Sequence, residues 1–282
     1  MLKKNYYCLV AGLPDLFFSE NKHGLSSLDF RNELKHQLSK TDFDLASLLY
    51  LPHDNKNLLN LIFEQNEPFS LLGIYDKEFL ESQITEPVKI PDYMTQFLLW
   101  TRNLETRELN LQIENKLHSL YYEYVVVKTK NNFLKEWFKF EMNIKNILTA
   151  FNCKQFNYQP EKHLIQADEN NRVYTLLINM HLKHELFEEE LPFADQLFRV
   201  AESNISPEER ENAIDKILWA YLDEHTFFHY FTIEKILSYI IKLGIVERWM
   251  KLDAETGKAL LNKLIEELKL SYTFPEEFST VK

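Results

Sequence analysis

The residues best suited to chemistry are two histidines, His225 and His229, which stand four positions apart in a segment with a helical pattern. This spacing can place both imidazoles on one side of a helix, where they can bind one metal ion. In zinc proteases of the H-E-x-x-H type a glutamate follows the first histidine, but Thr226 occupies that position here. No third ligand is indicated. The pair therefore favours a helix end where aromatic and polar residues meet, and a metal-dependent enzyme is the less favoured alternative.

Other candidate groups also lack the surroundings that catalysis requires. His181 and His184 stand three positions apart, but the glutamates between positions 185 and 190 are typical of a solvated acidic face or turn. With 43 Asp and Glu residues in the chain, carboxylates at helical spacing are inevitable, so their pairing alone does not indicate acid–base catalysis. The sequence thus predicts no catalytic, cofactor-binding or metal-binding residues, and no enzyme activity.

The chain contains only five glycines, which stand at Gly12, Gly24, Gly73, Gly244 and Gly257. Nucleotide-binding loops and nucleophile turns need closely spaced glycines, because these residues supply tight turns and let the backbone approach a ligand. No two glycines are close enough to form G-x-G-x-x-G, G-x-x-x-x-G-K-[ST] or G-x-S-x-G. We therefore expect neither a Rossmann fold, nor a P-loop ATPase, nor an α/β-hydrolase.

The formal net charge of −11 disfavours nucleic acid and direct lipid binding, because both partners select basic surfaces. Cys8 and Cys153 are too few and too far apart for a metal motif or a disulfide framework, which is typical of a reducing compartment. A short apolar run from Tyr6 to Leu13 ends at Pro14 without a cleavage site, and no run of 18 apolar residues occurs. We expect a soluble, cytoplasmic protein.

The spacing of apolar residues predicts an all-α fold, a multi-helix protein of packed helical lobes. Ser26–Asp29 has the pattern of a capping box that begins a helix. Asp42 and Asp54 are placed to cap two further short helices. Pro87 and Pro91 then mark the clearest boundary, because proline lacks a backbone N–H and biases the preceding residue away from the helical region.

Two long helices are predicted beyond this boundary. Their apolar residues recur at steps of three and four, as on one face of a packed helix. The first set is Leu109, Ile113, Leu117, Leu120 and Tyr124, and the second is Phe133, Trp137, Phe140, Ile144, Ile147 and Phe151. The run from Tyr121 to Val127 is also compatible with a locally extended segment.

The C-terminal third carries clear helix starts. Ser206–Glu209 combines a hydroxyl at the N-cap, proline at the first helical position and a carboxylate two residues later. Thr232 is predicted to begin a helix that is apolar around much of its circumference, as expected when other helices enclose it. Asp253 is predicted to cap a last helix with its apolar side formed by Leu261, Leu264, Ile265 and Leu268.

These elements divide the chain into three lobes of one compact unit: an N-terminal lobe (1–86), a lobe with the long helices (87–190) and a C-terminal lobe (191–282). A short internal echo relates Asn57–Ile62 to Asn143–Leu148, since both have the form N-x-x-N followed by two aliphatic residues. A repeated helical unit would agree with the lobed arrangement. The asparagines of the second copy either make hydrogen bonds between helices or face water.

Three segments carry a resemblance to a known family: Tyr6–Leu16, Phe140–Ala150, and Ile245–Trp249 with the Asp253 and Gly257 that follow. Together they resemble, over nearly the whole chain, a bacterial family of uncharacterised proteins encoded beside the subunits of V/A-type ATPases. The helix at 143–148 is also similar to the N-[IL]-[KR]-x-[IL]-[IL] helices of the subunit called C in prokaryotic V/A-type ATPases and d in eukaryotes.

The resemblance implies a non-catalytic rotor subunit that sits on the membrane proteolipid ring and receives the foot of the central shaft. We therefore predict a central-stalk linker of a V/A-type ATPase, cytoplasmic and peripheral to the membrane through the complex, with the shaft subunits and the proteolipid ring as partners. No cofactor is implied. A free-standing helical adaptor would lack affinity for rotor subunits, whereas a metal-dependent enzyme built on His225 and His229 would hold stoichiometric metal.

Overall fold

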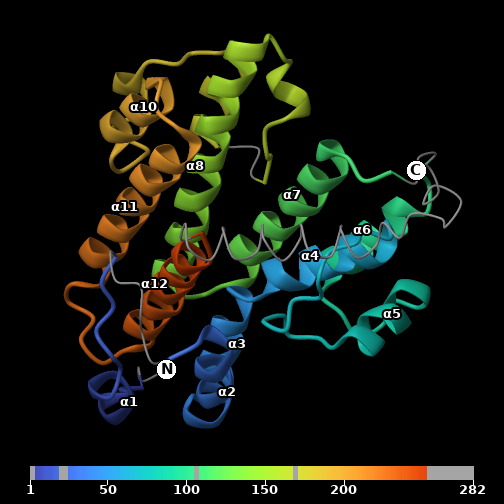
Figure 1. The fold of residues 1–282 in the computed structure, drawn as a ribbon, viewed down its shortest axis with the longest axis vertical. Coiled ribbons are helices and arrows are strands. Elements are labelled where there is room, and N and C mark those ends of the chain that lie inside the picture. Colours follow the sequence, from blue (N-terminus) through green and yellow to red (C-terminus); the bar gives the residue numbers. More distant parts are fainter. Residues whose placement is uncertain (1–3, 19–24, 105–107, 168–170, 253–282) are drawn as a thin grey trace, which may run out of the picture.

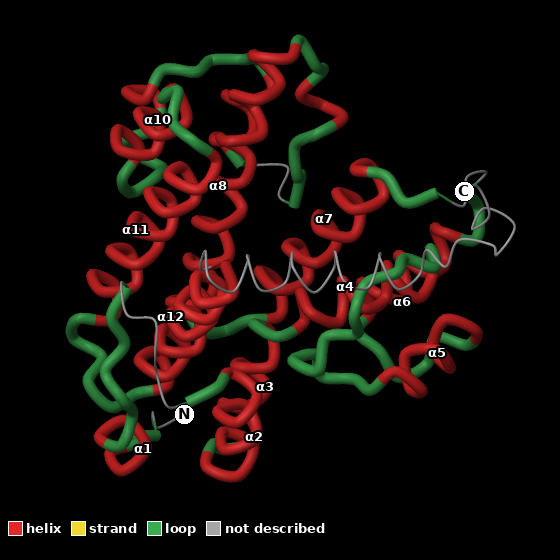
Figure 2. Tube along the Cα trace, viewed as in Figure 1, coloured by secondary structure: helices red, strands yellow, loops and turns green. Residues whose placement is uncertain are grey.

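The computed structural model describes residues 4–18, 25–104, 108–167 and 171–252. Within these residues the chain forms α-helices and two short 3-10 turns, and it contains no strand (Figure 2). The prediction of an all-α protein is confirmed. The helices are α1 (Tyr7–Ala11), α2 (Ser27–Gln37), α3 (Lys40–Leu48), α4 (Leu51–Ile62), α5 (Lys77–Thr85), α6 (Asp92–Thr101), α7 (Leu111–Lys128), α8 (Asn132–Phe156), α9 (Arg172–Ile178), α10 (Ala194–Glu202), α11 (Pro207–Thr226) and α12 (Ile233–Leu252), and the 3-10 turns are Pro160–Lys162 and His184–Leu186.

Helix α8 is the longest of the described helices, with 25 residues, and connects the two sides of the molecule (Figure 1). On one side α9 and α10 pack against it, and α11 packs against α10. On the other side α7 contacts α8, and α6 packs along α7. Helix α12 contacts α2, α3, α8 and α11, so it joins the N-terminal helices to the rest.

One continuous apolar core runs through these contacts, from Tyr6 beside α1 to Leu243 in α12. Because α8 has neighbours on several sides, it buries large side chains around much of its surface, among them Trp137, Phe138 and Phe140. The apolar residues predicted for this helix are buried, except for Phe151, which is partly buried against the core.

Side-chain caps fix where the helices begin. At α2 the hydroxyl of Ser26 accepts a hydrogen bond from the Asp29 N–H at 3.1 Å, which confirms Ser26 as the predicted helix start. At α11 Ser206 and Glu209 form a reciprocal capping box, with distances of 3.2 Å and 2.9 Å, which is also as predicted. The remaining side-chain caps are Ser39 at α3, Asp76 at α5, Asn110 at α7, Asn131 at α8 and Asn171 at α9.

Two predicted caps are wrong. Helix α3 begins three residues earlier than expected, because Ser39 caps it, and Asp42 lies inside its first turn. Helix α4 begins at Leu51, and Asp54 lies in its first turn with its carboxylate directed to the following loop. A carboxylate in the first turn also interacts favourably with the helix dipole, so the local pattern does not separate it from a cap.

The later helices follow the prediction closely. The run from Tyr121 to Val127 is helical throughout as part of α7, and α12 begins directly after Thr232. The predicted last helix, from Asp253 onwards, lies outside the described residues. Among the helices that are described, none combines the length and the apolar character needed to cross a bilayer.

Candidate functional site

The two histidines of the sequence pattern have separate partners. Helix α11 ends at Thr226, so His225 lies in its last turn and His229 lies beyond it. His225 stacks on the Tyr221 ring at 3.8 Å, and its Nδ1 donates to the Tyr221 carbonyl oxygen at 2.9 Å. The Nδ1 of His229 lies 3.3 Å from the Thr232 hydroxyl and 3.7 Å from a carboxylate oxygen of Glu234. The two imidazoles thus belong to different local contacts.

The second histidine pair does not form a site either. His184 lies 3.5 Å from the carboxylate of Glu185 and 3.4 Å from that of Glu188, in and after an exposed 3-10 turn. His181 makes only a backbone contact in this region, from its N–H to the Leu176 carbonyl at 3.0 Å. In the part of the chain that the structure describes, no three His, Cys, Asp or Glu side chains cluster as metal ligands.

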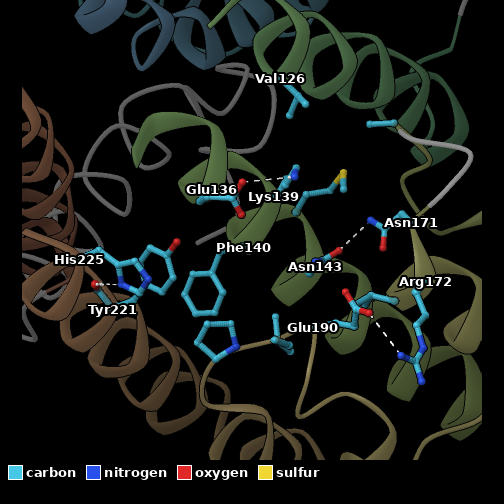
Figure 3. Close-up of a pocket in the computed structure, with 15 residues that line it drawn as sticks. Val126, Glu136, Lys139, Phe140, Asn143, Asn171, Arg172, Glu190, Tyr221 and His225 are labelled. Carbon is cyan, nitrogen blue, oxygen red and sulfur yellow. Dashed lines mark hydrogen bonds and ion pairs between the residues drawn. The ribbon is translucent and has the colours of Figure 1, made fainter. Parts of the chain in front are cut away.

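A cleft of about 280 Å³ lies between α8, α9 and α11, next to His225 (Figure 3). One wall is a stack of rings, in which Phe140 and Tyr221 are 4.0 Å apart and His225 covers the other face of Tyr221. The charged groups around the cleft have partners. Lys139 pairs with Glu136 at 3.3 Å, and Arg172 pairs with Glu189 at 3.3 Å and with Glu190 at 3.4 Å. The cleft therefore offers an aromatic wall and neutralised charges.

A more specific arrangement occurs in the loop after α4. The amide of Asn57 holds the backbone of Ser70, donating to its carbonyl at 2.9 Å and accepting from its N–H at 2.7 Å. The carboxylate of Asp54, one turn earlier, accepts from the N–H groups of Ile74 at 2.8 Å and Tyr75 at 3.1 Å. Since both side chains are fully buried, these bonds fix the loop that leads to α5.

Similar paired hydrogen bonds between an asparagine side chain and a loop backbone occur after α8. The amide of Asn146 donates to the Ile165 carbonyl at 2.8 Å and accepts from the Ile165 N–H at 2.8 Å. One turn earlier, Asn143 accepts from the side chain of Asn171, the N-cap of α9, at 3.1 Å (Figure 3). Buried asparagines thus attach a long helix to the loop and helix that follow it, as in the first copy.

This arrangement corrects the alignment of the internal echo. Asn57 and Asn146 play the same role. One turn earlier in each helix, Asp54 and Asn143 both accept from the segment that follows, Asp54 from backbone N–H groups and Asn143 from the side chain of Asn171. The repeat therefore relates residues 54–59 (Asp-Asn-Lys-Asn-Leu-Leu) to residues 143–148 (Asn-Ile-Lys-Asn-Ile-Leu), three positions away from the register predicted from sequence. The sequence signal was present, but Asp54 and Asn143 differ in residue type.

Asp54 is a buried carboxyl whose pKa is raised from 3.8 to about 6, chiefly by burial, although the N–H groups of Ile74 and Tyr75 and the charge of Arg31 oppose this rise. The folded protein therefore holds this proton more tightly than the unfolded chain. The resulting stabilisation is complete below pH 3.8 and is lost as the pH rises through about 6.

We expect the free energy of unfolding of the Asp54→Asn variant to depend less on pH than that of the wild type. Between pH 4 and 6.5 the difference between the two proteins should change by about 2 to 3 kcal/mol, at roughly 1.4 kcal/mol per pKa unit. Urea unfolding at a series of pH values measures this change. Parallel stability curves for the two proteins would contradict the assignment.

A fourth feature lies at the surface, in the loop 227–231 between α11 and α12, which we call the aromatic loop. Four of its five residues are aromatic, and the side chains of Phe227, Phe228 and Tyr230 are 65%, 80% and 62% exposed. The loop is held in place, because the Tyr6 N–H donates to the Phe231 carbonyl at 2.7 Å and the Tyr7 and Phe231 rings lie 4.7 Å apart. A fixed, exposed apolar patch is typical of an interaction surface.

Sequence reasoning missed the aromatic loop, although its signal was present. The spacing of His225 and His229 predicted a helix end where aromatic and polar residues meet, and it did not predict that the run Phe-Phe-His-Tyr-Phe around His229 is exposed. Aromatic residues in such a run are usually buried, but Phe227, Phe228 and Tyr230 are exposed in the loop that follows the end of α11 at Thr226.

The chain matches a model of a known protein family. A family model described as "Protein of unknown function (DUF2764)" matches residues 3–271. No curated protein matches the chain.

Proposed function

Since the chain belongs to the DUF2764 family, we propose from its own residues that it is a non-catalytic linker subunit of a V/A-type ATPase, coupling the central shaft to the membrane proteolipid ring. The family description assigns no role. The proposal is supported by the resemblance of the segments around Tyr6, Asn143 and Val246 to proteins encoded with these ATPases, and by the features below.

The observation that carries the proposal is the aromatic loop. A side chain such as Phe228, which is 80% exposed, contributes little to the stability of the isolated chain but gives a partner a large apolar contact. Tyrosine and tryptophan are enriched at the level of the membrane surface, and Tyr230 is one of the exposed residues of the aromatic loop. We therefore assign the aromatic loop to the contact with the proteolipid ring.

The buried asparagines also suit a coupling role. Asn57 and Asn146 attach the loops after α4 and α8 to the helices by paired hydrogen bonds, so these loops move with the core. Close-packed interiors compress little and transmit strain. A subunit that carries torque needs such connections between its loops and its core. An enzyme needs reactive groups brought together, but His184, His225 and His229 each lie in a separate local contact.

We expect the tagged protein, purified from its native cell in mild detergent, to recover both the shaft subunits and the proteolipid ring. The double variant Phe227→Ser/Phe228→Ser should recover at least 10-fold less ring protein, since buried aromatic contacts dominate interface energies. Mass spectrometry of the recovered complexes measures both partners. Val88→Ser is the matched control, because Val88 is 69% exposed and lies outside the aromatic loop.

Two outcomes would contradict the proposal. If wild-type bait recovers no ATPase subunit while the assembled ATPase is present in the same membranes, the linker role is wrong and the free-standing adaptor takes its place. If the double variant recovers as much ring as Val88→Ser does, the aromatic loop is not the ring contact. Because the salt dependence of an apolar contact is small, ring recovery should change little between 50 and 300 mM salt in the wild type.

A further inference from the structure

A hollow of about 460 Å³ lies where α8, α11 and α12 meet. No described residue lines both this hollow and the cleft of Figure 3, and the linker proposal does not use it. Pockets that bind small molecules have this size, and they combine mainly apolar walls with a few polar groups that orient the ligand. The apolar residues of the walls include Ile144, Leu148, Ile214, Leu218, Ile241 and Ile245.

Asp215 on α11 is a fully buried carboxylate that lines this hollow. Its Oδ2 accepts hydrogen bonds from the Trp249 indole at 2.6 Å and from the guanidinium of Arg248. Its Oδ1 is also buried, and no described group donates to it. Burial raises the pKa of Asp215 from 3.8, although Arg248 and Trp249 oppose this rise. A further donor, and above all a charged one, would therefore stabilise this carboxylate.

The ion pairs around the hollow leave one negative charge without a counterpart. Lys145 pairs with Glu141 at 3.2 Å. Arg248 serves two carboxylates, because one terminal nitrogen lies 2.9 Å from Glu211 and the other donates to Asp215. Among the described residues the hollow is thus lined by three acidic and two basic side chains. A ligand with a single positive charge would balance them.

Gly244 and Trp137 give the hollow an opening and an aromatic wall. Gly244 lies at an exposed position of α12 and lines the hollow, and a Cβ added there would meet no described atom within 4 Å. The missing side chain therefore leaves free space at this point. Trp137 on α8 lines the same hollow. The indole ring is the side chain that attracts organic cations most strongly.

We propose that this hollow binds a small organic ammonium ion with an apolar body. The ammonium group donates to Oδ1 of Asp215 and balances the second carboxylate that Arg248 serves. The apolar body lies against the isoleucine and leucine side chains of α8, α11 and α12, so one ligand contacts all three helices.

Three probes with the same apolar chain test the chemistry of the hollow: hexylamine, 1-hexanol and hexanoate. At pH 7 they carry a positive, a neutral and a negative head group. In isothermal titration calorimetry of the full-length protein, we expect hexylamine to bind at least 10-fold more tightly than 1-hexanol, because a hydrogen bond between charged groups is the stronger one. Hexanoate should bind most weakly. The proposal is overturned if hexylamine does not bind saturably, or if 1-hexanol binds as tightly.

Two variants place the binding at Asp215. Asp215→Asn keeps the shape of the side chain but removes its charge, so it should bind hexylamine at least 10-fold more weakly and leave the affinity for 1-hexanol unchanged. If Asp215→Asn fails to fold, Gly244→Leu still locates the site. Leucine fills the hollow and favours the helix more than glycine does, so this variant should fold and bind both probes at least 10-fold more weakly.

Asn152→Leu, at an exposed position of α8 outside the hollow, is the matched control and should bind both probes as the wild type does. Unchanged hexylamine affinity in a folded Asp215→Asn protein would overturn the role of the carboxylate. Equal losses of affinity in Gly244→Leu and Asn152→Leu would overturn the location of the site.

Discussion

Replacement of Gly73 by alanine is expected to lower the free energy of unfolding by about 2 to 4 kcal/mol. A Cβ at this position would lie 2.4 Å from Oδ1 of Asp54 and 3.3 Å from Nδ2 of Asn57. Neither side chain can move freely, because both are buried and hold the backbone of the same loop. The added methyl group must therefore break part of this arrangement, which leaves buried polar groups without partners.

Two other variants test whether the destabilisation by Gly73→Ala comes from the clash with Asp54 or from any change in this loop. Leu71→Ala changes an exposed neighbour, 69% exposed, and should shift the free energy of unfolding by less than about 0.5 kcal/mol. The cost of Gly73→Ala should also shrink in an Asp54→Ser background, where the shorter side chain leaves room for the methyl group. Chemical unfolding of the wild type, Gly73→Ala, Asp54→Ser and the double variant measures this difference. If Gly73→Ala lowers the free energy of unfolding equally in both backgrounds, contact with Asp54 is not the reason why position 73 requires glycine.

The helices were predictable from sequence because their signals are local. The N-cap residues Ser26 and Ser206 lie four and eight residues before Phe30 and Ile214, the first residues of the apolar stripes that follow, and both helices begin directly after these caps in the structure. The helix start after Thr232 was also predictable, since α12 is apolar around much of its circumference and contacts α2, α3, α8 and α11. At these positions the capping residues and the buried apolar residues indicate the same helix, so the helix start could be predicted from a single sequence.

The predictions for Asp42 and Asp54 failed for different reasons. Ser39, three residues before Asp42, accepts the Asp42 N–H and caps α3, so this error was local. The N–H groups that bind Asp54 are 20 and 21 residues along the chain, and the sequence pattern of the first turn does not contain that fact. The register of the internal repeat was missed because Asp54 and Asn143 differ in residue type, and their correspondence rests on hydrogen bonds that each accepts from the segment after its helix.

The candidate surface was less predictable than the fold. The sparse glycines argued against nucleotide-binding loops, but composition gave no indication that Phe227 and Phe228 face outward. Exposure there depends on where α11 stops and on how the backbone of Tyr6 holds Phe231. Both are tertiary properties, and an aromatic run of this kind carries the same sequence pattern whether it is buried or exposed.

Asn146→Ala is expected to destabilise the protein by about 2 to 4 kcal/mol, because it leaves both the N–H and the carbonyl of Ile165 buried without a partner. The loop at Ile165 should loosen first. Because this loop leads to α9, which packs against α8, the loss should then lower the stability of the whole fold. Among the described residues, hydrogen exchange should show the earliest loss of protection at 164–167 and 171–178, ahead of α8 itself.

Asn152→Ala provides the matched control on the same helix. Asn152 is exposed, and alanine has the higher helix propensity, so this variant should be neutral or slightly stabilising. If the repeat is physical, Asn57→Ala should reproduce the Asn146→Ala cost, with the first loss of protection at residues 70–75 instead. A cost for Asn146→Ala as small as that for Asn152→Ala would mean that the paired hydrogen bonds do not hold the loop, and the two helix–loop units would then share a sequence pattern without a shared mechanical role.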